Sequence, residues 1–190
     1  MNLLVDMLPK TVKIDHLDYP INTDFRVGIL FEQLMQDAGV REDQKLDLAI
    51  NLYFSNKVFN KSEAIKRILW FYRCGKDVEK TKGSGKSEAP IYDYDYDDAY
   101  IYSAFLEQYG IDLQDVKDLH WWKFKALFKS LSKDTKIVEI MGYRSIKIDS
   151  KLPKSQKDFY RRMKRIYKLP DGRSEEEKEH DIADIFSSMF

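Results

Sequence analysis

Apolar and polar residues alternate along one stretch near the N-terminus of the chain. Val12 and Ile14 alternate with polar residues, and Tyr19 and Ile21 are spaced in the same way after a polar turn. A period of two is typical of a β-strand with one buried face. Residues 11–21 are therefore predicted to form a short β-hairpin, which must pack on other elements because an isolated hairpin is marginally stable in water.

Apolar residues recur at a helical period through most of the chain that follows. Apolar positions at i, i+3, i+4 and i+7 indicate a helix with one buried face. The first such segment begins after the cap residues at 22–24 and stops at Gly39, and Asp112 is predicted to cap a later one. The further segments with this period are 46–53, 60–74, 95–109, 113–131, 133–141, 155–168 and 174–186.

Helix boundaries are indicated by the residue types that favour caps and stops. Asn60 and Glu63 have the spacing of a capping box, in which each side chain bonds a backbone N–H of the first helical turn. Gly75, Gly110 and Gly142 each follow a helical segment. We interpret them as helix stops, because glycine adopts the left-handed conformation that commonly ends a helix.

Residues 76–89, KDVEKTKGSGKSEA, interrupt the helical pattern with a polar, Gly/Ser-bearing stretch. Such a composition buries too little apolar surface to order itself, so we expect a mobile internal loop. Neither half of the chain looks self-sufficient without the other. The sequence thus predicts a mainly α fold, in which residues 1–190 form one multi-helix domain with a short N-terminal β-hairpin.

The charge of the chain is balanced overall but segregated near its C-terminus. Lys and Arg number 32 and Asp and Glu also number 32, which gives no general reason to expect nucleic-acid or membrane binding. Residues 143–173 hold 11 basic and 3 acidic side chains, whereas residues 174–190 hold 6 acidic and 1 basic. The chain has one cysteine and no stretch resembling a signal peptide or a spanning helix. We therefore expect it in the cytoplasm.

The acidic run YDYDYDD offers hard oxygen donors that suit a cation. Asp93, Asp95 and Asp97 match the first positions of a calcium-binding loop. Asp98, however, stands where that loop needs glycine, and Ala104 occupies position 12, where a glutamate is required. We interpret the run as the acidic start of a helix, which suits the positive end of the helix dipole.

Residue types used in catalysis are present without the spacing that catalysis needs. His16, His120 and His180 lie more than 50 residues apart, and Cys74 has no base nearby in the sequence. The glycines of residues 82–86 fail the spacing of a phosphate-binding loop. We therefore expect a protein that is not an enzyme, with no metal site and no cofactor.

The segment 154–168 carries the strongest signal for a charged partner. Arg161, Arg162 and Arg165 share a predicted helix with two tyrosines, and arginine can bind phosphates while tyrosine stacks on bases. The same charges could form a solvated face or pair with the acidic helix predicted after them. The apolar residues of this helix, which we expect to pack, are Phe159, Met163 and Ile166.

Trp121 and Trp122 are the remaining candidates for a binding site. Neighbouring residues point about 100° apart on a helix, so the two indoles cannot face the same way. We expect one to serve the core and the other to lie at or near a surface where a partner binds.

Four sequence blocks carry a resemblance to a known family. They are the opening NLLVD at residues 2–6, YGIDL at 109–113, LHWWKF followed by ALF and DT within 119–135, and IMGYRS at 140–145, the second preceded by the tyrosine-rich acidic run. In this pattern the chain resembles the gene-fifteen-product family of siphophages that infect Gram-positive bacteria. The resemblance extends nearly to the C-terminus.

The resemblance implies a tail assembly chaperone, because genes of this family lie in the tail cluster just before the tape-measure gene. Such a factor binds the phage tape-measure protein in the host cytoplasm, with the major tail protein as a possible second partner, and is absent from the mature virion. The resemblance assigns no binding residue; our candidates for partner contact are Trp121, Trp122, Arg161, Arg162 and Arg165.

Two other classes of function stay open at this point. One is a structural tail or connector component that is retained in the virion. The other is a helical regulator that binds nucleic acid through residues 154–168, although nucleic acid is not the partner we expect. Self-association also stays open, whereas a membrane is not expected as a partner.

Overall fold

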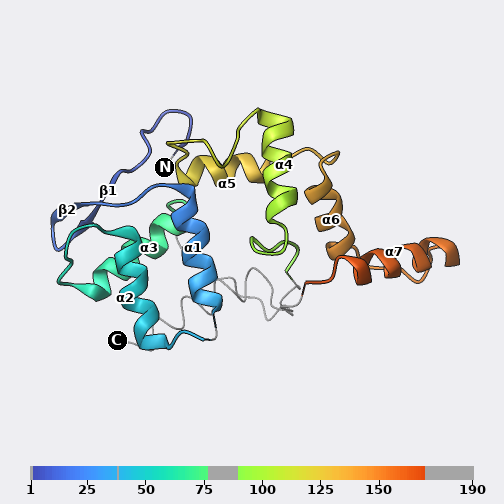
Figure 1. Ribbon diagram of the computed structural model, residues 1–190, viewed down its shortest axis with the longest axis horizontal. Coiled ribbons are helices and arrows are strands. Elements are labelled where there is room, and N and C mark those ends of the chain that lie inside the picture. The colour runs from blue at the N-terminus through green and yellow to red at the C-terminus, as the bar shows by residue number, and fades with distance from the viewer. Residues whose placement is uncertain (1, 38, 77–89, 170–190) are drawn as a thin grey trace. The chain divides into compact units, whose positions relative to one another are not determined.

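The computed structural model describes residues 2–37, 39–76 and 90–169 of the 190-residue chain (Figure 1). In these ranges the chain forms seven α-helices and one two-stranded antiparallel sheet, which confirms the predicted mainly α fold. The described residues group into two compact units. Unit 1 contains residues 2–76 and 117–126, and unit 2 contains residues 90–116 and 127–169.

The predicted hairpin is present in unit 1. Strand β1 (Thr11–Ile14) pairs with β2 (Leu17–Pro20), and Ile14 lies opposite Leu17. Asp15 and His16 form the two-residue turn with φ angles of 48° and 69°. Two left-handed residues define the type of turn whose twist matches that of the paired strands. Val12 and Ile14 point into the core, as the alternation predicted.

Unit 1 also contains three helices whose first residues favour a helix N-terminus. Helix α1 (Phe25–Gln36) is capped by Asp24, whose carboxylate accepts from the Arg26 N–H at 2.8 Å. Helix α2 (Glu42–Tyr53) has Glu42 and Asp43 in its first turn, near the positive end of its dipole. Helix α3 (Lys61–Tyr72) begins at the predicted cap Asn60, which accepts from the Glu63 N–H at 3.0 Å.

Gly75 follows the end of helix α3, as predicted, but Cys74 precedes it as the first left-handed residue. Cys74 takes the first left-handed position, at φ 55°, and Gly75 takes the next, at φ 73°. The Cys74 N–H donates to Phe71 O at 3.0 Å, and the Gly75 N–H donates to Trp70 O at 2.9 Å. This is the paired hydrogen-bond pattern of a Schellman motif.

Helix α5 (Trp121–Lys129) is much shorter than the predicted segment 113–131. The backbone where α5 begins bonds the start of α1 instead of continuing a helix backwards. The Phe25 N–H donates to Leu119 O at 3.0 Å, and the Trp121 N–H donates to Thr23 O at 2.7 Å. Asp112 caps only a single turn, by accepting from the Gln114 N–H at 2.8 Å.

Unit 2 contains helices α4 (Asp98–Tyr109), α6 (Lys136–Ser145) and α7 (Lys154–Ile166), together with the end of α5. Gly110 ends α4 in the left-handed conformation, at φ 64°, as predicted. The prediction that Gly142 stops a helix is wrong, because α6 continues to Ser145. Helical backbone is compatible with glycine, so a glycine after an apolar repeat does not by itself end a helix.

Two predictions fall largely outside the described residues. The loop expected at 76–89 is described only at Lys76, and the acidic helix expected at 174–186 is not described.

Gly110 and Gly142 provide a test of helix-end chemistry that packing does not disturb, since an added Cβ would meet no atom within 4 Å at either site. Gly110→Ala should destabilise the protein by roughly 1–2 kcal/mol, because alanine is strained in the left-handed region. Gly142→Ala should stabilise it by about 0.5–1 kcal/mol, because alanine favours a helix interior. Urea unfolding measures both. Equal shifts of the same sign would contradict the assigned helix ends.

Candidate interaction site

Trp121 and Trp122 both lie in the core of unit 1, at 0% and 1% exposure. Their indole N–H groups donate to the last carbonyls of α3: Trp121 to Tyr72 O at 2.8 Å and Trp122 to Phe71 O at 2.7 Å. The expectation that one of the two would lie at a surface is wrong. Helix α3 provides an acceptor for each indole, so neither side chain needs a partner protein or water.

Close packing fixes both rings. A Cβ added at Gly28 would lie 2.4 Å from the Trp121 ring, and one added at Gly75 would lie 2.8 Å from the Trp122 ring. Glycine is therefore needed at position 28 by the approach of helix α1 to an indole, and no apolar period could have indicated this. The Tyr72 ring stacks on Trp121 at a centroid distance of 5.5 Å.

His120 is a structural residue at the start of α5. Its Nδ1 accepts from the Trp122 N–H at 3.0 Å, and Nε2 lies 3.1 Å from Pro9 O. Nδ1 is thus unprotonated, and Nε2 carries the proton that it donates to Pro9. Burial lowers the pKa of this imidazole, and the charges of Lys123 and Lys10 lower that pKa further, against the opposing effect of the Pro9 carbonyl.

The acidic run before α4 folds into turns in which aspartate carboxylates accept backbone hydrogen bonds. Asp93 accepts from the backbone N–H groups of Asp95 and Tyr96, and Asp97 accepts from the Asp93 N–H at 2.9 Å. Asp97 also forms a bidentate ion pair with Arg144, with N–O distances of 2.5 and 2.9 Å. These side chains serve as turn formers and as a counter-ion, which fits the interpretation of the run as a helix start.

The Asp97–Arg144 pair was not anticipated from the sequence pattern, although Arg144 stands in the IMGYRS block. The pair is buried, with side-chain exposures of 1% and 8%. Arg144 also donates to Ile91 O at 3.0 Å and to Tyr167 O at 2.6 Å. A spacing of 47 residues between the two partners gives no local signal for such a contact.

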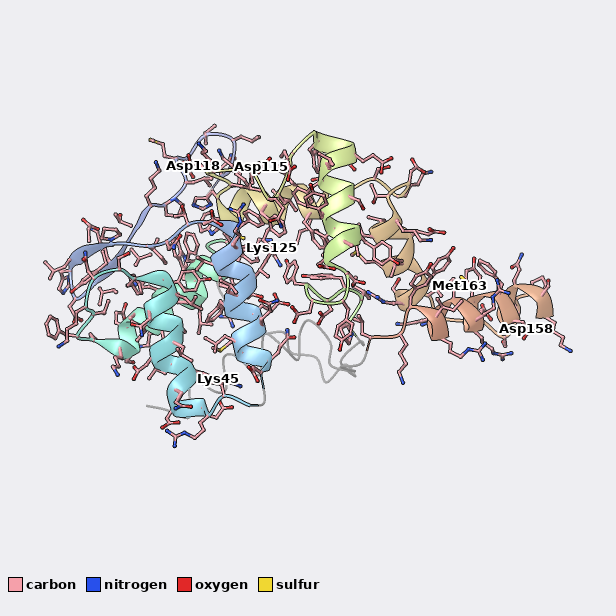
Figure 2. All side chains as sticks on the ribbon, viewed as in Figure 1. Lys45, Asp115, Asp118, Lys125, Asp158 and Met163 are labelled. Atoms are coloured by element: carbon pink, nitrogen blue, oxygen red, sulfur yellow. The ribbon has the colours of Figure 1, made fainter. Side chains whose placement is uncertain are left out.

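Helix α7 carries the candidate surface. Arg161, Arg162 and Arg165 are exposed on it, and no residue of the helix is buried. Phe159 and Ile166, which we expected to pack, are 43% and 57% exposed. The side chains of α7, Met163 among them, are drawn in Figure 2. We call the exposed apolar and basic side chains of Lys154–Ile166 the α7 surface.

Helix α6 packs against α7. The Tyr143 ring contacts Phe159 edge-on at 5.9 Å and stacks on Tyr167 at 5.9 Å. Lys164 of α7 donates to Arg144 O at 2.7 Å. These contacts fix the orientation of α7 on α6, and they leave much of Phe159 and Ile166 accessible to another chain.

Among the described residues, the other side chains considered for catalysis or metal binding do not form a cluster. Cys74 is half-buried, and its thiol donates to Tyr72 O at 3.9 Å. Within the described ranges no group of three or more His, Cys, Asp or Glu residues is placed to hold a metal ion. No helix in the same ranges is long and apolar enough to cross a membrane.

The part of the chain that the structure describes is mainly helical, and its basic helix α7 has no buried residue. A family model described as Bacteriophage Gp15 protein matches residues 4–169. The chain belongs to this phage protein family. No curated protein and no solved structure matched the chain.

The lowered pKa of His120 predicts how stability depends on pH. The folded state favours the neutral ring, so below the ordinary value of 6.5 the unfolded state binds more protons and stability falls. We expect the free energy of unfolding to decrease from about pH 7.5 to about pH 5.5, and His120→Gln to flatten this slope. Urea unfolding across this range is the measurement. His16 and His180 remain in both proteins, so an unchanged slope would contradict the assignment.

Proposed function

We propose that this Gp15-family protein is a tail assembly chaperone, which binds the tape-measure protein of its phage in the host cytoplasm and is absent from the mature virion. It acts by binding and not as an enzyme. The observation that supports this role is the α7 surface, where large apolar side chains stay accessible between basic ones on a helix held firmly by α6.

The physical requirement comes from the client. A tape-measure protein is a long chain with amphipathic helical stripes, and such stripes aggregate unless they are covered before the tail tube forms. A helix that presents Phe159 and Ile166 can pack along an apolar stripe, in the manner of helix-in-groove recognition. The major tail protein then replaces the chaperone when the tube assembles.

The basic side chains of α7 favour particular partners and orientations in this contact. Arg161, Arg162 and Arg165 are exposed, so their charges are screened and each contributes little affinity on its own. Together they speed association with an acidic stretch of the client and disfavour basic partners. Of the five candidate residues, these three arginines are the ones we assign to partner contact.

A nucleic-acid-binding regulator is the second candidate, and the same helix favours it. Basic residues alternate there with Tyr160 and Tyr167, which offers phosphate contacts and stacking faces. Tyr167, however, already stacks on Tyr143 and lies under the Lys136 amine, 5.3 Å from the ring centroid. Because the Tyr167 ring already makes these contacts, less of it is available to stack on a base. We therefore place nucleic-acid binding second to the chaperone function. Binding that fell steeply with salt would mark it as electrostatic.

Co-expression with the tape-measure protein tests the proposal. We expect the two proteins to co-purify and the tape-measure protein to become soluble. Phe159→Asp should weaken the complex by about 2 kcal/mol or more, as for an aromatic hot spot, with nearly unchanged melting temperature. Leu48→Asp in α2 is the matched control, because Leu48 is also 43% exposed and lies outside the α7 surface.

The outcomes separate the candidate functions. If the two proteins never co-purify and tape-measure solubility is unaffected, the chaperone proposal is wrong. If both variants bind as well as the unaltered chain, the binding surface lies outside α7. Mass spectrometry of purified particles addresses the structural alternative, since a retained tail or connector component is found there and a chaperone is not.

A further inference from the structure

Residues 2–7 form a turn of unit 1 that presents four apolar side chains to solvent. Leu4, Val5 and Met7 are 91%, 77% and 92% exposed, and Leu3 is 50% exposed. We call this segment the 2–7 turn. Single exposed apolar residues are common on protein surfaces, but a contiguous group of them marks a site of interaction.

The 2–7 turn is held in its conformation by its own hydrogen bonds. Asn2 O accepts from the N–H groups of Val5 and Asp6 at 3.3 and 2.9 Å, and Asn2 Oδ1 accepts from the Leu4 N–H at 2.9 Å. The Asn2 N–H in turn donates to Asp6 Oδ2 at 2.6 Å. Because these donors have acceptors inside the turn, moving it into an apolar medium leaves none of them unsatisfied.

The base of the 2–7 turn is fixed to the core of unit 1 and is positively charged. Pro9 O lies 3.1 Å from His120 Nε2, and Lys10 O accepts from the Ile21 N–H at 3.0 Å. Besides burial, the charges of Lys123 and Lys10 lower the pKa of His120, so both amines lie near this base. Both lysine side chains are exposed.

The size and charge of this surface indicate what kind of partner it fits. A stable interface between two copies of a chain takes about 20–30 residues from each side, and the turn has only six. A fluid apolar layer, in contrast, can surround a protruding tip on all sides. Lysines around an apolar tip match a layer whose surface is negatively charged.

We propose that the 2–7 turn inserts into the surface of an anionic lipid bilayer, with Lys10 and Lys123 among the headgroups. Insertion of this kind reaches about 5–10 Å, to the boundary between headgroups and acyl chains. The Asp6 carboxylate stays hydrated at this depth. The cytoplasmic leaflet of a membrane carries anionic lipids and therefore offers such a surface.

The sequence gave no reason to expect a membrane as a partner, because the net charge is zero and no stretch is long and apolar enough to span a bilayer. Neither observation applies to a turn that enters only the interface. That contact needs a few exposed apolar side chains and a local positive charge. Both are properties of the folded chain and not of its composition.

The expected affinity is modest. The four apolar side chains contain about as much hydrocarbon as one myristoyl chain, which binds membranes reversibly with an association constant of about 10⁴ M⁻¹. The two lysines strengthen the contact on anionic lipid. The proposal does not involve the α7 surface or the tape-measure protein, so it and the chaperone function can each fail without the other.

Co-sedimentation with lipid vesicles tests the insertion. The 190-residue chain is mixed with vesicles of phosphatidylglycerol and phosphatidylcholine in equal parts, at about 1 mM accessible lipid, where a constant of about 10⁴ M⁻¹ binds about nine-tenths of the protein. Leu4→Asp and Met7→Asp should each lower the constant about tenfold or more, because a carboxylate replaces an inserted apolar group. Their melting temperatures should not change, since both side chains are almost fully exposed. Unaltered protein that stays in the supernatant, or variants that sediment equally well, would overturn the proposal.

Two control variants show whether the turn itself makes the contact. Phe59→Asp adds the same charge at an apolar side chain of unit 1 that is 80% exposed, and Phe159→Asp adds it on the basic helix α7. Both should sediment like the unaltered chain. Loss of binding in Phe59→Asp would mean that added charge alone decides the result, and loss in Phe159→Asp would assign the lipid contact to α7. Vesicles of phosphatidylcholine alone should bind less protein, and equal binding to them would overturn the role of the two lysines.

Discussion

The guanidinium of Arg144 joins three segments of unit 2 that are far apart in the sequence. It pairs with Asp97 at the start of α4, donates to Ile91 O before that helix, and donates to Tyr167 O after α7. The Lys164 amine of α7 in turn donates a hydrogen bond to the backbone oxygen of Arg144. A buried charge is tolerated only with its partners in place, and loss of one partner costs several kcal/mol. The orientation of the α7 surface therefore depends on Arg144 together with Tyr143, both of which belong to α6.

Local sequence signals predicted the elements of the fold well. The alternation at residues 11–21, the Asn60 cap and the left-handed Gly110 all depend on neighbours in the chain, and each is present as expected. The failures have a different origin. Helix α5 is short because backbone groups of residues 119 and 121 bond the distant start of α1, and no local period reports such a bond.

The candidate site was harder to predict for the same reason. Spacing on a helix led to the expectation that one of Trp121 and Trp122 would reach a surface, but both are buried, and their indoles donate to the terminal carbonyls of α3. The exposed arginines of α7 were recognisable from composition. The exposure of Phe159 was not, because an apolar stripe is the same in sequence whether its own chain covers it or another one does.

Unit 1 is built from segments that are far apart along the chain, and this has a consequence for synthesis of the protein. Its core takes Trp121 from a segment made after residues 90–116, which belong to unit 2. A ribosome releases the chain in order, so the hairpin and α1–α3 emerge long before the indole that packs against Gly28. During this interval the α1 face at Gly28 and the last carbonyls of α3 lack their native partners. Unit 1 is thus a product of late translation, and a chain terminated before residue 121 would leave its core open.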